Sequence, residues 1–211
     1  TLQLAYPASG YQVFIQDLYH HRKISLLYRL DGIPIVTWLP DGSRLFYTVM
    51  SADNVAAGRF DLYLVDIVTR KVEPVLVDQP FIRFLTWSPD SSQFAFISDL
   101  NDLCIQTLAD AVQNCFGWQG IRQVVWSPDG NRLAYIREGS APGIYLTDTA
   151  GTTGQQLVAG TQFSDVVWSP DGQNLLYGVN LPDTWQRDLY VISASGGEPQ
   201  RLTDVTRLVY S

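Results

Sequence analysis

Apolar and polar residues alternate along this chain in short runs of strand length. The run "GIYLTDTAG" from Gly143 is typical, because an alternating stretch ends in a polar turn that contains small residues. Alternation with a period of two predicts half-buried β-strands, and clusters of Gly, Pro, Asp and Ser predict the turns between them. We therefore expect an all-β protein.

The alternation is organised in a repeat. Each copy starts with a Trp that is followed by a Pro-Asp turn, as in "VWSPDGNRLAY" from Val125. Pro presets φ, Asp can bond its own backbone two residues on, and Gly accepts positive φ, so this segment predicts a tight turn between two strands, A and B. Two further strands, C and D, complete each copy. The tryptophans are Trp38, Trp87, Trp126 and Trp168, at spacings of 49, 39 and 42 residues.

A four-stranded repeat of about 40 to 45 residues predicts the blades of a β-propeller, since one small sheet cannot bury both its faces alone. The Trp of strand A and the aromatic residue of strand B would fill the space between blades. The strand B aromatics are Tyr47, Phe96, Tyr135 and Tyr177. The turn aspartates, Asp41, Asp90, Asp129 and Asp171, are expected to serve the turn rather than a metal ion.

The two ends of the chain complete a count of five blades. Residues 1–30 show three strand-like runs without a strand A, and "VTRLVYS" from Val205 resembles a strand A without a blade. Tyr210 follows Trp168 by 42 residues. We expect one domain over 1–211, closed by the C-terminal strand joining the N-terminal blade, which leaves no open sheet edge. The predicted blades are 205–211 with 1–30, 31–79, 80–119, 120–161 and 162–204.

The pattern "WSPDG...LAY...IYLTD" resembles the TolB-type, WD40-like (PD40) propeller repeat, and the resemblance covers nearly the whole chain. It implies a propeller fold. The best-known members of that family have six blades, so the five counted here depart from the pattern. Similar repeats form the propeller domains of prolyl-oligopeptidase-like peptidases, but those need a separate α/β-hydrolase domain, which this sequence does not hold.

Composition and charge exclude some partners. The net charge is -7 and the 14 basic residues are scattered along the chain, whereas a nucleic-acid surface needs Lys and Arg gathered on one face. No run of about 18 uncharged apolar residues is present, so no membrane span is expected. The 46% of hydrophobic residues is enough for a sizeable core.

Catalytic motifs are scarce. The sequence holds no GxSxG elbow, no HExxH and no glycine-rich phosphate loop, and its two histidines, His20 and His21, are adjacent in a polar turn. A glycosidase would need paired carboxylates across a cleft, and the inner strands offer only Asp165. We expect no enzyme activity, no cofactor and no metal. An alternative is an enzyme that uses loop carboxylates, with Asp53, Asp99, Asp102 and Asp183 as candidates.

The candidate binding face carries the B–C and D–A loops, because these vary between blades whereas the A–B turns are nearly uniform. At the third and fourth positions before each Trp or its Tyr equivalent stand Arg83, Arg122, Gln123, Asp165 and Arg207. These could line the mouth of a central channel and bind an anionic group. Alternatively, the arginines and the aspartate pair with each other across neighbouring blades. The loops add Trp185, Asp53 and Asp183 as further candidates for partner contacts.

These features predict a non-enzymatic module that recognises a protein or peptide through the variable-loop face and channel mouth. The alternatives are carbohydrate or small-anion binding in the channel, and a spacer or gate domain of a larger protein. The oligomeric state is not predicted.

The two cysteines bear on the cellular compartment. Cys104 and Cys115 flank a turn centred between Ala109 and Asp110, which places them directly opposite each other in a hairpin. Their Cα atoms would then be about 4.5 to 5.5 Å apart, close enough for a disulfide. A disulfide would indicate a periplasmic, cell-surface or secreted protein, whereas two buried thiols in a cytosolic propeller are the alternative. TolB-type proteins are often exported, so the resemblance favours export.

Overall fold

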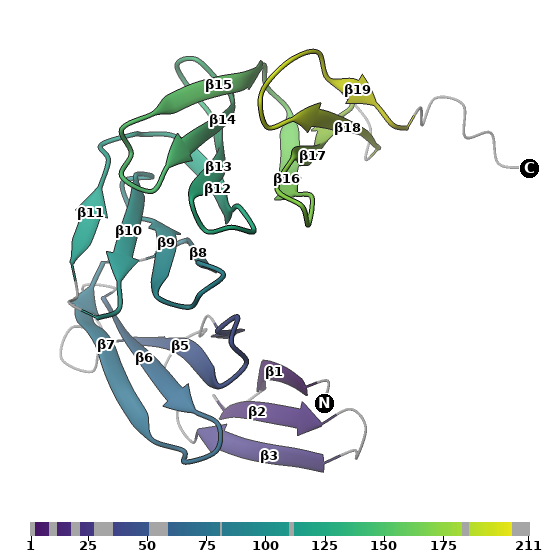
Figure 1. The fold of residues 1–211 in the computed structure, drawn as a ribbon. Coiled ribbons are helices and arrows are strands. Elements are labelled where there is room, and N and C mark those ends of the chain that lie inside the picture. The colour runs from purple at the N-terminus through teal and green to yellow at the C-terminus, as the bar shows by residue number, and fades with distance from the viewer. Residues whose placement is uncertain are drawn as a thin grey trace, which may run out of the picture. The chain divides into compact units, whose positions relative to one another are not determined.

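The computed structural model describes residues 3–8, 12–17, 22–27, 36–50, 59–80, 82–109, 112–182 and 186–203. These residues form nineteen β-strands, which pair into five antiparallel sheets (Figure 1). The chain divides into two compact units. The first comprises Thr1–Ile82 with Leu108–Ala111, and the second comprises Arg83–Thr107 with Val112–Ser211.

The first unit holds two sheets. Blade 1 is three-stranded, with β1 (Gln3–Ala8), β2 (Gln12–Asp17) and β3 (Arg22–Leu27) in that order. Blade 2 is four-stranded, with β4 (Val36–Trp38), β5 (Arg44–Met50), β6 (Phe60–Asp66) and β7 (Val72–Gln79). In blade 2, Leu45, Tyr47 and Val65 are buried and pack with Trp38 and Tyr63.

The second unit holds three four-stranded sheets, each ordered A to D along the chain. Blade 3 contains β8 (Phe84–Trp87), β9 (Gln93–Ile97), β10 (Leu103–Thr107) and β11 (Gln113–Cys115). Blade 4 contains β12 (Ile121–Trp126), β13 (Arg132–Arg137), β14 (Gly143–Asp148) and β15 (Gly154–Ala159). Blade 5 contains β16 (Phe163–Trp168), β17 (Asn174–Asn180), β18 (Arg187–Ser193) and β19 (Gln200–Arg201).

The cores of the second unit lie between neighbouring blades. Ala95 and Ile97 of blade 3 pack with Trp126, Leu133 and Tyr135 of blade 4. The opposite face of blade 4 packs in the same way against blade 5. Side chains alternate between the two faces of a strand, so the central strands of blade 4 contribute residues to the cores on both sides of that blade.

Two of the strand A tryptophans join successive blades, in agreement with the inter-blade position predicted for them. The Trp126 indole N–H donates to the backbone carbonyl of Thr86, at 3.1 Å, and that of Trp168 donates to the carbonyl of Val125, at 3.3 Å. In both cases the acceptor is the residue directly before the Trp of the preceding blade. The same contact therefore joins blade 3 to blade 4 and blade 4 to blade 5.

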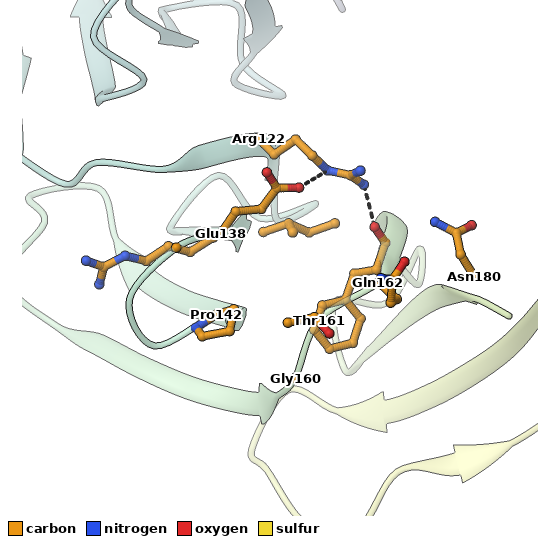
Figure 2. A pocket seen from close by; sticks show the side chains of 11 residues that line it. Arg122, Glu138, Pro142, Gly160, Thr161, Gln162 and Asn180 are labelled. Atoms are coloured by element: carbon orange, nitrogen blue, oxygen red, sulfur yellow. Dashed lines mark hydrogen bonds and ion pairs between the residues drawn. The ribbon is translucent and has the colours of Figure 1, made fainter. Parts of the chain in front are cut away.

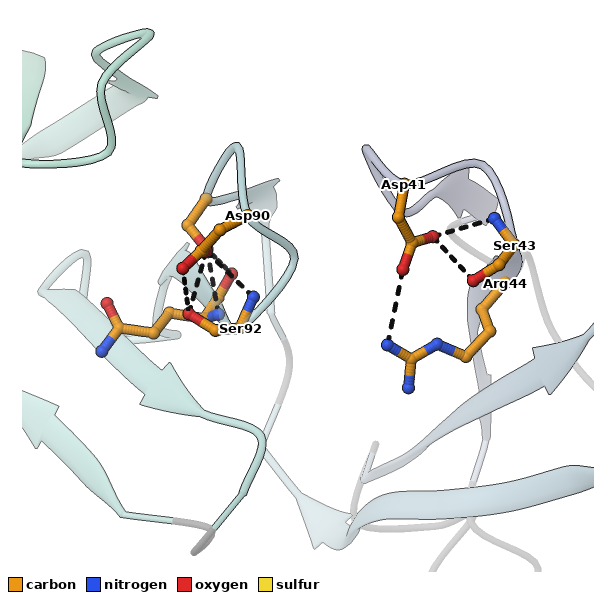
Figure 3. Close-up of polar contacts among 7 residues, drawn as sticks. Asp41, Ser43, Arg44, Asp90 and Ser92 are labelled. Atoms are coloured by element: carbon orange, nitrogen blue, oxygen red, sulfur yellow. Dashed lines mark hydrogen bonds and ion pairs between the residues drawn. The ribbon is translucent and has the colours of Figure 1, made fainter.

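The turn role of the four aspartates is also confirmed. Asp41 accepts the N–H and hydroxyl of Ser43, both at 2.8 Å, and lies 3.6 Å from the guanidinium of Arg44 (Figure 3). Burial alone would raise the pKa of Asp41, but these bonds and the Arg44 charge outweigh it and lower that pKa. Asp90 accepts from Ser88 and Ser92, and these bonds hold its pKa below the usual value. The carboxylates are thus used within their own turns.

The prediction of five four-stranded blades is confirmed only in part. The described residues form four four-stranded sheets, and the N-terminal sheet has three strands. The strand predicted to complete blade 1, residues 205–211, lies outside the described residues. The four-stranded sheets fall within the predicted ranges 31–79, 80–119, 120–161 and 162–204. The closed ring and the single domain stay predictions.

Candidate functional site

The blades of the second unit have two different ends. At one end, which we call the turn face, the A–B turns carry the Pro-Asp motif. At the other end, which we call the loop face, the B–C loops and the D–A connections lie together. Three cavities of the second unit are lined by residues of the loop face, and all three include Glu138 at the end of β13.

The first cavity, the blade 4–5 cavity, has a volume of about 280 Å³ (Figure 2). Its walls come from the B–C loop of blade 4, the connection into blade 5 and the end of β17. They include Arg122, Glu138, Pro142, Gln162, Phe163 and Asn180. Cationic, amide and apolar groups therefore meet in one small space.

Arg122 bridges blades 4 and 5 at this cavity. Its Nε lies 3.5 Å from Glu138, and its Nη2 donates to the backbone carbonyls of Phe163, at 2.6 Å, and Ser164. Gln123 makes a paired contact beside it, donating to the carbonyl of Val166 at 3.3 Å and accepting the Val166 N–H at 3.0 Å. Both residues thus bond the backbone of the neighbouring blade. The ion pair of Arg122, however, is with Glu138 of its own blade rather than with an aspartate across blades, and Arg122 also lines the cavity.

The second cavity, the blade 3–4 cavity, has a volume of about 190 Å³. The exposed Arg83 lines it together with Asn101, Arg122 and Glu138. Two of the predicted arginines therefore share a cavity. Asp165 instead forms an ion pair with Arg187 of its own blade, at 3.1 Å, and lines none of the three cavities.

Several candidates cannot be placed. Asp53, Asp183, Trp185 and Arg207 lie outside the described residues, as do His20 and His21. Of the loop carboxylates, Asp102 accepts the backbone N–H groups of Gly117, at 2.9 Å, and Trp118, at 2.7 Å. Asp102 thereby holds the connection between blades 3 and 4, which is a structural role.

The disulfide prediction is confirmed. Cys104 on β10 and Cys115 on β11 face each other in register and are bonded, with Cα atoms 4.1 Å apart. Together with Asp102 they form the single group of three metal-ligating side chains within the described part of the chain, but their sulfurs are bonded to each other. A disulfide fits an extracytoplasmic location.

Arg137 is a loop-face residue that the sequence reasoning missed. It lines the blade 4–5 cavity and a third cavity of about 380 Å³, which Gly117, Gln119, Gly139 and Ser140 also line. Its Nε is buried and has no hydrogen-bond partner among the residues that the structure describes. Comparison of the repeats could have found it, since the residue two positions after the strand B aromatic is charged in blade 4 alone. The equivalent residues of blades 2, 3 and 5 are Val49, Ser98 and Val179.

Gly120 fixes the loop face between blades 3 and 4. Its φ is +80°, and a Cβ there would lie 2.4 Å from the carbonyl oxygen of Glu138. The close approach lets the Glu138 N–H donate to the Gly120 carbonyl, at 2.8 Å. Only glycine allows both the conformation and the contact.

No α-helix within the described ranges is long and apolar enough to cross a membrane.

Comparison with known proteins is informative at the level of structure alone. No family model matches the sequence, and no curated protein matches it. Solved structures do match. TolB from Acinetobacter baumannii superposes with a TM-score of 0.68 at 20% identity, over 95% of this chain and 51% of that one. A putative TolB from Agrobacterium tumefaciens superposes with a TM-score of 0.66 at 15% identity, over 94% of this chain and 76% of that one.

The structural neighbours include an enzyme. Oligogalacturonate lyase from Vibrio parahaemolyticus superposes with a TM-score of 0.73 at 16% identity, over 95% of this chain and 62% of the lyase. The chain thus spans about half of the Acinetobacter TolB and less than two thirds of the lyase. Identities this low show the fold and do not decide between binding and catalysis. The fold of this chain is that of the TolB-type β-propeller.

Proposed function

We propose that this protein is a non-enzymatic binding module that recognises a protein or peptide through its loop face. The observation that carries the proposal is the contrast between the two faces. Three cavities meet around Glu138 on the loop face, whereas the turn face uses its carboxylates within its own turns. Irregular loops on a rigid scaffold are where recognition commonly resides.

The sizes of the cavities favour a peptide surface. Small-molecule sites commonly enclose about 300–1,000 Å³, and two of the three cavities, at about 280 and 190 Å³, are smaller. Adjacent small cavities with mixed polar and apolar walls suit successive side chains of an extended partner. Phe163 and Pro142 supply apolar contact, and Gln162 and Asn180 supply hydrogen bonds.

A second candidate is the binding of a small anion or an acidic carbohydrate. Arg83, Arg122 and Arg137 all line these cavities, which favours negatively charged ligands. One structural neighbour is an oligogalacturonate lyase. Its carbohydrate class is therefore a reasonable alternative ligand for this chain.

We also propose that residues 205–211 close a five-bladed ring. Leu189 and Val167 of blade 5 are 38% and 47% exposed, and a further blade packed on that face would cover these apolar side chains. The disulfide supports a further part of the proposal, that the protein works in a periplasmic, cell-surface or secreted setting.

Affinity capture from a native extract tests the binding role. The loop-face variant carries Arg83→Ala, Gln162→Ala and Asn180→Ala, and the matched turn-face variant carries Asn131→Ala and Gln173→Ala. A protein retained by wild type and by the turn-face variant should bind the loop-face variant at least about tenfold more weakly. Equal retention by all three would reject the loop face. Binding on a glycan array without protein capture would favour the second candidate.

A further inference from the structure

Arg137 departs from the repeat at a position that faces two cavities. The aromatic of strand B is followed two residues later by Val49, Ser98 and Val179 in blades 2, 3 and 5, and by Arg137 in blade 4. This position ends β13, where the strand enters the loop face. The blade scaffold therefore does not require a cation there, because the other three blades form without one.

The Arg137 guanidinium lacks the partners that its neighbours have. The other arginines of blades 4 and 5 each meet an acceptor: Arg122 pairs with Glu138, Arg132 bonds the Gly172 carbonyl, Arg187 pairs with Asp165, and Arg201 pairs with Asp188. Within the described residues, the Arg137 side chain makes no hydrogen bond or ion pair, and its Nε is buried. Among the described arginines of blades 4 and 5, Arg137 is thus the one whose side chain has no acceptor from the protein, and the part of its guanidinium that lines the cavities is left to bond a ligand.

The surroundings leave room for that acceptor. Arg137 lines the cavity of about 380 Å³ together with the small or neutral residues Gly117, Gln119, Gly139 and Ser140. The one acidic residue there, Glu138, is engaged by Arg122. The guanidinium is thus accessible from a cavity with neutral donors on its walls.

We propose that Arg137 binds a carboxylate of the partner peptide, either an Asp or Glu side chain or a free C-terminus, in the cavity between Gly117 and Ser140. This inference rests on the proposed peptide-binding function and names its anchor. A guanidinium matches the two oxygens of one carboxylate with parallel hydrogen bonds. A phosphate fits less well, because its second negative charge would lie near Glu138 and the protein already carries a net charge of -7.

Selection from a random peptide library displayed on phage tests the anchor. The targets are wild type and two variants. Arg137→Met keeps the length of the side chain and removes its charge. Arg137→Lys keeps the charge and removes the paired N–H donors of the guanidinium. Arg132→Gln is the control, since it removes one positive charge from the other end of the same strand. Wild type and the control should enrich one acidic position or a free C-terminus, and Arg137→Met should not.

Binding of a synthetic selected peptide then gives the magnitude. Its affinity should fall about tenfold or more with Arg137→Met, and by a similar factor when its acidic residue is replaced by the amide. The two changes together should cost no more than either alone, because they remove the same contact. Additive losses would overturn the pairing. Acetate or phosphate that binds Arg137 as tightly as the peptide would overturn the peptide carboxylate as its ligand.

The melting temperature separates this role from a structural one. Removing an unpaired buried donor should leave the Tm of Arg137→Met unchanged or raised. A large fall in Tm, with peptide binding retained per folded molecule, would overturn the inference. Peptides selected without an acidic preference would overturn the Arg137 anchor and leave the loop-face function standing. No peptide selected by wild type would count against the proposed function itself.

Discussion

Blades 4 and 5 have the same strand register, but other sheets of the second unit cover both faces of blade 4 and only one face of blade 5. Ile144 of blade 4 is fully buried against blade 5. Its equivalent in blade 5 is Leu189, since Ile144 pairs with Ile136 as Leu189 pairs with Gly178. Leu189 is 38% exposed, and Val167, the equivalent of Val125, is 47% exposed.

The difference shows what a blade needs from its neighbours. Local sequence builds the same four strands in both places, but the second apolar face is buried only when another sheet packs on it. Leu176 and Val191 continue the apolar face of blade 5 beside Leu189. Blade 5 therefore has a partly exposed apolar face. The proposed closure of the ring would pack another blade on that face.

The largest expected effect is at the covered face. Ile144→Ala should lower the free energy of unfolding by about 2–5 kcal/mol, because it opens a cavity in the core between blades 4 and 5. Leu202→Ala is the control, since Leu202 is 52% exposed and should change stability by less than about 0.5 kcal/mol. Urea unfolding measures both. Equal effects would contradict the view that stability resides between the blades.

The next effect concerns how outer strands are held. In blade 3 the disulfide holds the exposed three-residue strand β11, whereas in blade 5 the ion pair of Arg201 with the buried Asp188 holds β19. Replacing Cys104 and Cys115 together by Ala should cost about 2–3 kcal/mol, mainly by loosening the unfolded chain. Unfolding of the oxidised and the reduced wild type provides the comparison. If the oxidised and the reduced protein have the same free energy of unfolding, the disulfide does not stabilise blade 3.

Much of the fold could be predicted because its determinants are local. The Trp-Ser-Pro-Asp turn contains its own hydrogen bonds, so strands A and B and the opposition of Cys104 to Cys115 follow from nearby residues. The blade count could be predicted less directly, because the proposed closure would pair residues 205–211 with residues about 200 positions earlier. Pairing over that distance leaves no local pattern.

The site could be predicted less well, for a physical reason. The partners of Arg122 are the carbonyls of Phe163 and Ser164, some 40 residues later, which become available only when blades pack. Every residue has such carbonyls, so the sequence gives no signal for them. Arg137 belongs to no motif, and it is conspicuous only because Val49, Ser98 and Val179 occupy the same place in other blades.

A smaller effect tests the proposed closure of the ring. If another sheet covers the second face of blade 5, Leu189→Asp should lower stability by about 1–2 kcal/mol, because it places a charge in an apolar contact. Leu100→Asp is the matched control, since Leu100 is 73% exposed in a loop of blade 3. Thermal unfolding compares the two variants. If both are equally harmless, the face of blade 5 is open to water and the closure proposal fails.

The smallest effect should be the same in blades 4 and 5, because it concerns the turns that they share. The Ser127 hydroxyl lowers the pKa of Asp129, and the Ser169 hydroxyl lowers that of Asp171. Since the folded pKa lies below the unfolded value, near 4, this stabilisation is present above about pH 4 and is lost as the pH falls.

Asp129→Asn and Asp171→Asn, which keep an acceptor for the turn but cannot titrate, should each make the decline of Tm below about pH 4 slightly shallower. The two shifts should be alike, although the two blades differ in how their faces are covered. Ser127→Ala, which keeps the carboxylate but removes the hydrogen bond that lowers its pKa most, should act in the same direction as Asp129→Asn. A decline as steep as that of wild type would mean that the acid sensitivity arises elsewhere. Unequal shifts would show that a neighbouring sheet packed on a blade also affects the acid stability of that blade's turn.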